Sequence, residues 1–188
     1  EKAAEKPNII LIFTDDQRYN TIHALGDAQV ITPNLDGLVK GGTTFSHAYN
    51  MGAWGGAVCV TSRAMLLTGM SVWDVYKEEK DYSKLYNKQG FWPQQMKKAG
   101  YETYMTGKWH VQQKADAIFD HVVHERPGMP NQTPAGYNRP LSRADTTWQP
   151  WDTKYEGFWK GGTHWTQVVA DDALNFIDEA SKKDTPFF

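Results

Sequence analysis

The sequence predicts an α/β fold with a mostly parallel sheet flanked by helices. The first observation is a continuous apolar run of strand length, Asn8 to Phe13, which is typical of a strand buried on both faces. The second is that strand-like and helix-like patterns alternate along the chain. A chain of 188 residues with 40% hydrophobic and 13% aromatic residues can also bury a core of ordinary size.

The first helix is predicted from its end signals. Thr32 suits the N-cap, Pro33 suits the first helical position, and the glycine pair 41–42 suits the end. Alternating bulky residues then predict a strand from Thr43 to Tyr49. A glycine-rich loop, 52–57, leads to the next helix.

Cys59 stands at the head of this second predicted helix. Thr61 and Ser62 suit its cap region, and Gly69 suits its end. Backbone N–H groups and the positive end of the helix dipole would face any anion that a group at this position attacks. Arg63, four residues after Cys59, would lie on the same face of the helix.

Three further elements are predicted in the second half of the chain. Pro93 begins a helix that ends at Gly100, a strand follows at 101–106, and 107–110 lies just past its end. Helical spacing returns from Trp165 to Ala180. Between them, residues 116–162 are rich in proline, glycine and aromatic residues without periodicity, which predicts a long functional loop or an insertion.

Composition excludes several classes of function. Twenty basic residues against 22 acidic ones give a net charge of −2, which argues against nucleic acid as a partner. No apolar run is long enough for a membrane span. Residues 1–6 form a polar stub like that left when a signal peptide is removed, so we expect a periplasmic or secreted protein. Residues 185–188 read as the entry into another strand, as expected for the N-terminal portion of a larger domain.

Asp15 and Asp16 directly follow the first predicted strand. Ligands of open α/β sheets bind at the carboxyl ends of strands. Two adjacent carboxylates repel each other unless a cation lies between them, and their hard oxygens suit Ca²⁺ or Mg²⁺. The competing interpretation is a pair of solvated loop acids.

Four motifs together resemble the type I, formylglycine-dependent sulfatases of the alkaline phosphatase-like superfamily. They are the segment 7–18 ending in Asp15-Asp16-Gln17-Arg18, the segments 32–36 and 41–49, the run from Cys59 to Gly69, and Gly107-Lys108-Trp109-His110. The resemblance covers residues 7–188, and it implies the N-terminal part of a sulfatase catalytic domain. Any one motif alone is weak, and four in the family's order are specific.

The resemblance implies a residue-level mechanism. A formylglycine-generating maturation enzyme would oxidise Cys59 to formylglycine, whose hydrate would attack the sulfate ester. Asp15 and Asp16, with the modified Cys59, would hold a divalent cation, usually Ca²⁺ with Mg²⁺ as the alternative. Arg63 would stabilise the hydrate, Lys108 would bridge the nucleophile and a sulfate oxygen, and His110 would assist release of sulfate. The further ligands and catalytic residues of the family would lie downstream of residue 188.

The expected substrate is a sulfated carbohydrate, as in polysaccharide degradation. The aromatic segment offers flat faces for sugars, and its arginines offer forks for further sulfate or carboxylate groups. Those residues are Tyr137, Trp148, Trp151, Tyr155, Trp159, Trp165, Arg126, Arg139 and Arg143. Packing is the competing role for the aromatics.

Two alternatives to a carbohydrate sulfatase stay open at this level. One is a phosphodiesterase or phosphonate monoester hydrolase of the same superfamily, which would share the metal-binding turn. The other is an inactive homologue that binds sulfated glycans. The second alternative follows from Thr61, which stands where the family's motif has proline or alanine, within the stretch that maturation enzymes read.

Overall fold

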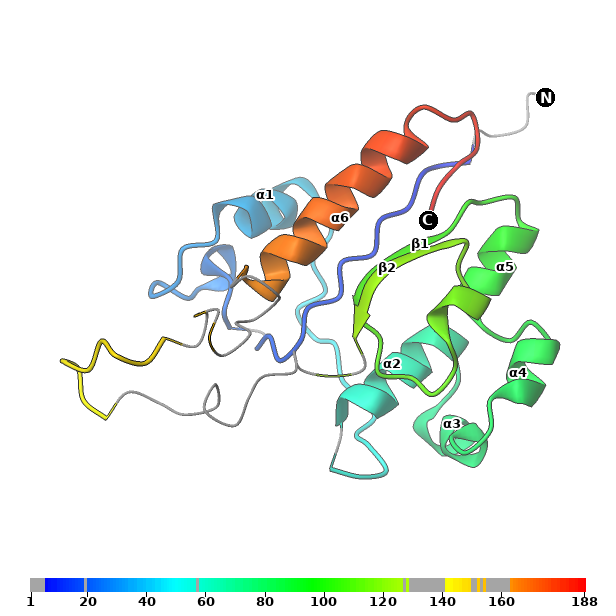
Figure 1. Ribbon diagram of the computed structural model, residues 1–188, viewed down its shortest axis with the longest axis horizontal. Coiled ribbons are helices and arrows are strands. Elements are labelled where there is room, and N and C mark those ends of the chain that lie inside the picture. The colour runs from blue at the N-terminus through cyan, green and yellow to red at the C-terminus, as the bar shows by residue number, and fades with distance from the viewer. Residues whose placement is uncertain are drawn as a thin grey trace. The chain divides into compact units, whose positions relative to one another are not determined.

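The computed structural model describes residues 6–18, 20–56, 58–126, 128, 141–149, 152, 154 and 163–188. The chain divides into two compact units, each described by itself: Leu11–Gly52, and the combination of Glu1–Ile10 with Ala53–Phe188. Its helices and strands are labelled in Figure 1.

The smaller unit, 11–52, is built on one helix. The 3-10 helix η1 (His23–Leu25) precedes α1 (Pro33–Gly41), whose predicted start at Pro33 is confirmed. Asp36 joins the two, because its Oδ1 accepts the Ala24 N–H at 2.9 Å and the Thr32 hydroxyl at 2.9 Å. The Thr32 hydroxyl therefore donates its hydrogen bond to Asp36, and Thr32 forms no side-chain cap.

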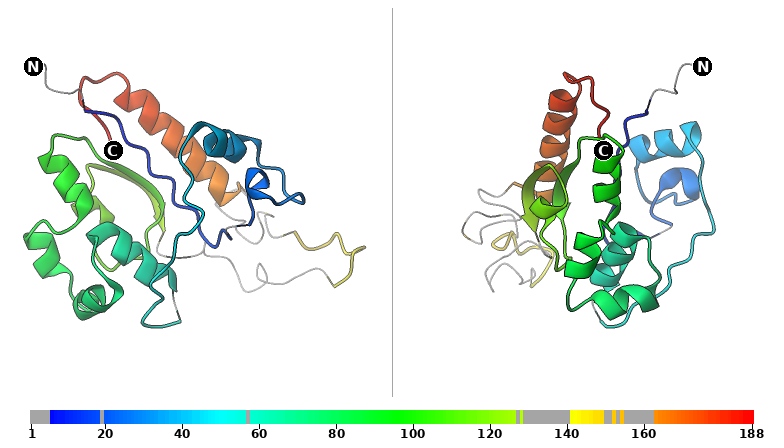
Figure 2. Two further views of the ribbon diagram at one scale, coloured as in Figure 1. Left: turned by 180° about the vertical axis from the view of Figure 1, so that it is seen from behind. Right: turned by 90° about the vertical axis from the view of Figure 1, so that its right-hand side faces the viewer.

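The larger unit contains five α-helices and a parallel strand pair among its described residues. The helices are α2 (Val58–Thr68), α3 (Val72–Glu78), α4 (Ser83–Asn87), α5 (Trp92–Lys98) and α6 (Trp165–Ala180). The strands are β1 (Tyr104–Lys108) and β2 (His121–Arg126), separated by the 3-10 helix η2 (Ala115–Ala117). Helix α6 lies on one side of the strand pair and α2–α5 lie on the other (Figure 2).

The strand pair is extended by the end of the chain. Glu102 and Phe187 form a parallel bridge, and the Tyr104 N–H donates to the Phe188 carbonyl at 2.8 Å. On the other side of the C-terminal segment, the Phe187 carbonyl accepts the Ile9 N–H at 2.9 Å. Residues near 9, 187, 104 and 122 therefore lie in neighbouring extended segments, which confirms a parallel α/β arrangement.

Local sequence explains where the helices begin. In α5 the Gln94 side chain reaches back to accept the Phe91 N–H at 3.3 Å, which satisfies one unpaired N–H of the first turn. Ser71 does the same for α3, since its hydroxyl accepts the Asp74 N–H at 3.3 Å. At α6 the His164 ring accepts the Thr166 N–H at 3.2 Å.

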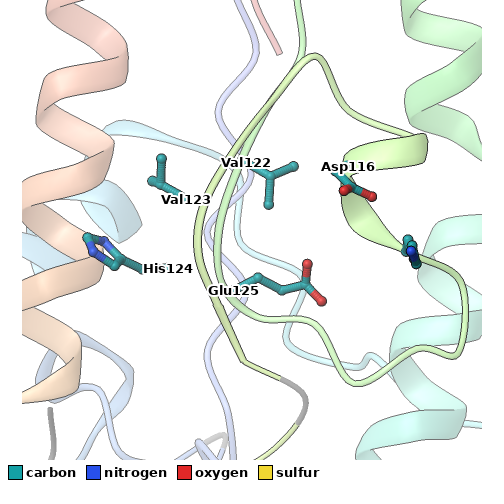
Figure 3. A pocket seen from close by; sticks show the side chains of 6 residues that line it. Asp116, Val122, Val123, His124 and Glu125 are labelled. Atoms are coloured by element: carbon teal, nitrogen blue, oxygen red, sulfur yellow. The ribbon is translucent and has the colours of Figure 1, made fainter.

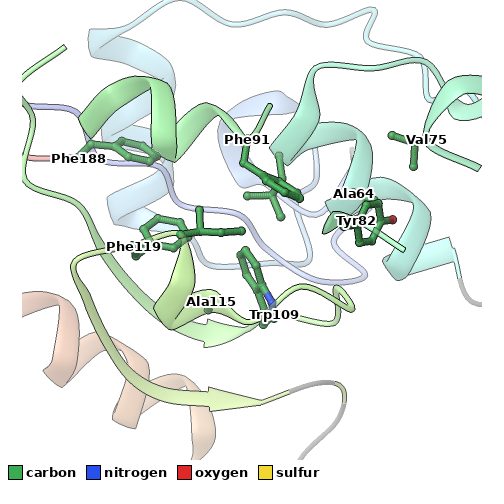
Figure 4. Packing of buried hydrophobic residues seen from close by; sticks show 10 residues of the cluster. Ala64, Val75, Tyr82, Phe91, Trp109, Ala115, Phe119 and Phe188 are labelled. Atoms are coloured by element: carbon green, nitrogen blue, oxygen red, sulfur yellow. The ribbon is translucent and has the colours of Figure 1, made fainter. Parts of the chain in front are cut away.

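The core lies between the strand pair and α2–α5 (Figure 4). It is largely aromatic: Trp109 and Phe119 meet edge to face at 5.9 Å between ring centroids, and so do Tyr82 and Phe91. The other members are Ala64, Leu67, Val75, Ala115, Ile118 and Phe188. This core packs against one face of β1 and includes Trp109, the residue directly after the strand. It therefore positions residues 108–110.

Several predicted elements differ in the structure. Residues 8–13 and 43–49 form no strand, and Ile10 to Phe13 stay exposed, because the backbone hydrogen bonds found here reach only Ile9. The strand predicted at 101–106 begins at Tyr104 and runs on to Lys108. The prediction of a loop from residue 116 missed β2, although most of 127–162 lies outside the described residues.

None of the described helices combines the length and the apolar character needed to cross a membrane.

Candidate functional site

Helix α2 carries Cys59 and Arg63 in the same unit as Lys108 and His110. The helix begins at Val58, so Cys59 lies in its first turn and is half-buried, with Arg63 one turn further along. The predicted cap at Thr61 and Ser62 is wrong by one turn. Thr61 is instead a fully buried residue within the helix.

Arg63 connects the two motifs that the sequence singled out in this unit. Its guanidinium Nη1 donates a hydrogen bond to the backbone carbonyl of Lys108, 45 residues further along the chain. This bond joins α2 to the end of β1. The helix that carries Cys59 and the segment that begins at Lys108 are therefore neighbours in this unit.

Lys108, Trp109 and His110 are separated by their backbone geometry. Lys108 is the last residue of β1, not a residue past its end. Trp109 turns into the core, with only 5% of its surface exposed, and its N–H donates to the Arg126 carbonyl at 2.7 Å. His110 has φ +54°, in the left-handed region, so the simple alternation that would put Lys108 and His110 on one side does not continue past Trp109.

A non-glycine residue in the left-handed region is uncommon, and such residues cluster at functional sites. The described residues contain four: Asp16, Gln89, His110 and His124. Two of them, Asp16 and His110, are residues that the sequence analysis had assigned to the site. Aspartate and histidine adopt this region more readily than most non-glycine residues, so local preference is enough to explain both conformations.

Asp15 and Asp16 belong to the smaller unit and are exposed. They supply two adjacent hard oxygen donors, which is the right chemistry for Ca²⁺, although that ion takes six to eight ligands. Among the residues described here, no three histidine, cysteine or acidic side chains gather into a complete metal site. The pair thus fits as part of a ligand set.

A buried carboxylate on α6 was not predicted from the sequence. Asp172 is only 8% exposed; it accepts the Thr106 hydroxyl at 2.7 Å, and its Oδ2 lies 2.8 Å from His124 Nδ1. The signal was present in the sequence, because Asp172 lies four residues after the buried Val168 and so falls on the apolar face of the helix. His124 had been assigned no role.

A hollow of about 370 Å³, largely open to solvent, lies beside β2. Lys114, Asp116 and residues 122–125 line it. Glu125 and Val122 point toward Asp116, whereas Val123 and His124 lie toward α6 (Figure 3). Burial and the nearby Asp116 carboxylate raise the pKa of Glu125. None of the predicted site residues lines this hollow.

The aromatic segment is only partly described. The guanidinium of Arg126 lies 4.9 Å from the ring centre of Trp165, so these two pack on each other at the start of α6. Trp148 is half-buried and Arg143 is exposed. The other predicted sugar-binding residues, Tyr137, Arg139, Trp151, Tyr155 and Trp159, lie outside the described residues.

The chain aligns with known sulfatases along nearly its whole length. It is 27% identical over 206 residues to rat N-acetylgalactosamine-6-sulfatase, an alignment that covers 99% of this chain and 38% of that protein. It is 27% identical over 192 residues to an N-acetylglucosamine-6-O-sulfatase of Bacteroides thetaiotaomicron, covering 97% of this chain and 29% of that protein. An arylsulfatase of Clostridium perfringens is 36% identical over 108 residues, which is 56% of this chain and 21% of that protein.

The chain thus spans less than two-fifths of the length of these relatives. No solved structure matches it significantly. The family model described as Sulfatase matches residues 7–188, the same range in which the four motifs occur and which includes Cys59, Arg63, Lys108 and His110. This chain belongs to the sulfatase family.

Proposed function

We propose that the protein is a sulfuric ester hydrolase that removes sulfate from a sulfated polysaccharide or oligosaccharide. The observation that carries this is the hydrogen bond from Arg63 to the Lys108 carbonyl, because it places the predicted nucleophile helix against the predicted sulfate-binding segment. Relatives named for sulfated N-acetylhexosamines support a carbohydrate substrate. An aryl sulfate is the simplest alternative substrate, given the arylsulfatase relative.

Cys59 is the proposed nucleophile once a maturation enzyme has oxidised it to formylglycine. A plain thiolate would form a thiosulfate with no easy exit, whereas the hydrated aldehyde can release sulfate. The half-buried position of Cys59 in the first turn of α2 suits this role, since backbone N–H groups and the dipole favour the anionic substrate there.

Three basic side chains, Arg63, Lys108 and His110, serve the sulfate and the nucleophile. Arg63 holds the Lys108 backbone and provides a fixed positive charge one turn from Cys59. Lys108 neutralises a sulfate oxygen, and His110 moves a proton during release of sulfate. Asp15 and Asp16 would hold a divalent cation, Ca²⁺ or Mg²⁺, which would supply further positive charge for the sulfate oxygens. We place the protein in the periplasm or outside the cell.

The decisive experiment measures the mass of the peptide that contains Cys59, from protein made in its native host, together with sulfate release from sulfated oligosaccharides. We expect an aldehyde at residue 59, and we expect Cys59→Ala to lose at least 1,000-fold in sulfate release, the scale of a lost nucleophile. Val58→Ala, an exposed neighbour on the same helix, is the control.

Two other results would contradict this function. An unmodified thiol with tight glycan binding and no sulfate release would favour the glycan-binding homologue, with Thr61 as the reason. Faster turnover of an aryl phosphate than of any sulfate ester would favour the phosphodiesterase or phosphonate hydrolase.

A further inference from the structure

A β-bulge lies next to the segment that carries Lys108 and His110. Along the strand pair, Thr106 pairs with Val123 but Gly107 pairs with Glu125, so His124 is an extra residue without a position opposite it in β1. His124 has φ +44°, in the left-handed region that non-glycine residues seldom occupy.

This bulge sets the register of the residues that follow it. Beyond it, Lys108 pairs with Arg126, and the Arg126 carbonyl accepts the Trp109 N–H at 2.7 Å. Without the extra residue, the pairing would slip by one position, and each side chain of the slipped strand would turn to the opposite face. The pairing of Lys108 with Arg126 therefore depends on the extra residue in β2, and Gly107, directly before Lys108, has φ +101° at the same level.

Asp172 of α6 holds the bulge from outside the sheet. Its carboxylate lies 2.8 and 3.0 Å from His124 Nδ1 and accepts the Thr106 hydroxyl at 2.7 Å, so it binds one residue on each strand at the level of the bulge. Helix α6 also approaches β1 one residue further along. A Cβ placed on Gly107 would lie 3.5 Å from the Val169 side chain of α6, in van der Waals contact. Asp172 is buried, whereas the His124 side chain is 43% exposed, so the contact with Thr106 is the better shielded of the two.

We infer that Asp172 is a positioning residue for the sulfate-binding segment: through Thr106 and His124 it maintains the bulge that directs Lys108 and His110. It does not touch the substrate. Since Lys108 and His110 act on sulfate only under the proposed function, the consequence for catalysis rests on that function, whereas the consequence for the register does not.

The test uses a rescue in the full-length protein. Asp172→Ala removes both contacts, and we expect kcat for sulfate release to fall at least 10-fold with KM changed less than 3-fold, because a misplacement of about 1 Å can cost 100-fold in rate. Adding His124→Gly should return kcat to within 3-fold of the wild type, because glycine adopts the left-handed conformation without an anchor. Asp171→Ala, whose carboxylate only accepts the exposed Gln167 amide, is the matched control.

Amide hydrogen exchange at Trp109 provides a readout that needs no activity. Exchange should be at least 10-fold faster in Asp172→Ala than in the wild type, and slow again in the double variant. A role in stability alone predicts that the double variant is no better than Asp172→Ala, and that result, or an unchanged Trp109 amide in Asp172→Ala, would overturn the inference. If the wild type released no sulfate, the proposed function would fail while the exchange data still decided the role of Asp172.

Discussion

Thr61 shows how one residue can affect both stability and maturation. It is fully buried in α2, and its hydroxyl finds no hydrogen-bond partner among the described residues. A buried unsatisfied hydroxyl typically costs about 1–3 kcal/mol. The same position holds proline or alanine in the family's motif, so in this chain a stability defect and a departure from the maturation signal coincide.

Replacing Thr61 by valine should stabilise the protein. Valine has nearly the same shape and removes only the unsatisfied hydroxyl, so we expect the free energy of unfolding to rise by about 1 kcal/mol in urea denaturation. Thr61→Ser keeps the hydroxyl and loses a methyl group, so it should lower stability by about 1 kcal/mol. A valine variant less stable than wild type would show that the hydroxyl has a partner in solution.

Sulfate release should depend on the planar set of N–H donors of the Arg63 guanidinium and not only on its positive charge. Arg63→Lys keeps the charge but has a compact ammonium that does not reproduce the guanidinium geometry, so we expect sulfate release to fall about 100-fold. Arg63→Met leaves the Lys108 carbonyl without this donor and should also lower stability by about 1–3 kcal/mol. Activity and thermal unfolding are measured on both variants, with exposed Lys84→Met as the control. Wild-type activity in Arg63→Lys would contradict the role of these donors.

At the scale of elements, the strand pair and α6 are joined at two levels. Asp172 joins them near the end of β1, and Glu102 joins them near its start. The Glu102 carboxylate accepts from Lys183 Nζ, just after α6, at 2.7 Å and lies 2.6 Å from His121 Nε2 of β2. Tyr104 stacks on His121 with 4.5 Å between ring centroids. These contacts fix α6 along its length, so its buried Asp172 meets the bulge.

The contact at Glu102 predicts a pH dependence of stability. The hydrogen bond from Lys183 holds the pKa of Glu102 below its ordinary value, despite the opposing effect of burial. The ionised Glu102 carboxylate therefore stabilises the folded state fully above the ordinary glutamate pKa of about 4.3. This stabilisation is lost as the pH falls through the lower pKa that Glu102 has in the folded state. Glu102→Gln should be less stable than wild type at pH 7, and the difference should shrink toward pH 3.

Urea denaturation at several pH values between 7 and 3 measures this effect. Glu179→Gln is the control, because Glu179 is the more exposed partner of the same lysine at 3.3 Å, and we expect a change of less than about 0.5 kcal/mol. A constant difference between wild type and Glu102→Gln across the pH range would show that the Glu102 carboxylate does not titrate with unfolding.

At the scale of the whole molecule, the predicted site residues are divided between two units. Cys59, Arg63, Lys108 and His110 lie in the larger unit, and Asp15 and Asp16 lie in the unit of residues 11–52. The larger unit has a core of its own, whereas the smaller one is organised around Asp36 and few buried side chains. We therefore expect the two units to respond differently to removal of a divalent cation.

Under the proposed function, removal of the divalent cation should lower sulfate release while the larger unit stays folded. We expect chelation to lower sulfate release at least 10-fold, added Ca²⁺ to restore it, and Trp109 amide protection to persist throughout. Asp15→Asn and Asp16→Asn should each weaken Ca²⁺ binding at least 10-fold by calorimetry, because each removes a charged oxygen ligand. Asp27→Asn, in the same unit, should bind Ca²⁺ as the wild type does. Full binding by both site variants would exclude the pair as ligands.

Local signals in the sequence were sufficient for several of the helices and for the family, although α3 and α4 were not predicted. Pro33, Pro93 and the apolar spacing from Trp165 to Ala180 predicted α1, α5 and α6, because helix ends and faces depend on neighbours within a few residues. The motifs around Cys59 and Lys108 predicted the sulfatase family, which the match over residues 7–188 confirms.

Only the tertiary structure decided the features that depend on contacts between distant residues. The pairing of β1 with β2, the bulge at His124 and the bond from Arg63 to Lys108 each join segments separated along the chain, and no local pattern encodes such a distance. The burial of Asp172 was visible only as an acidic residue on an apolar helix face, and its partners Thr106 and His124 were not. The sequence by itself determined the family and the segments that carry its motifs, and the tertiary structure decided how those segments are held, because strand register and buried hydrogen bonds are properties of the packed chain.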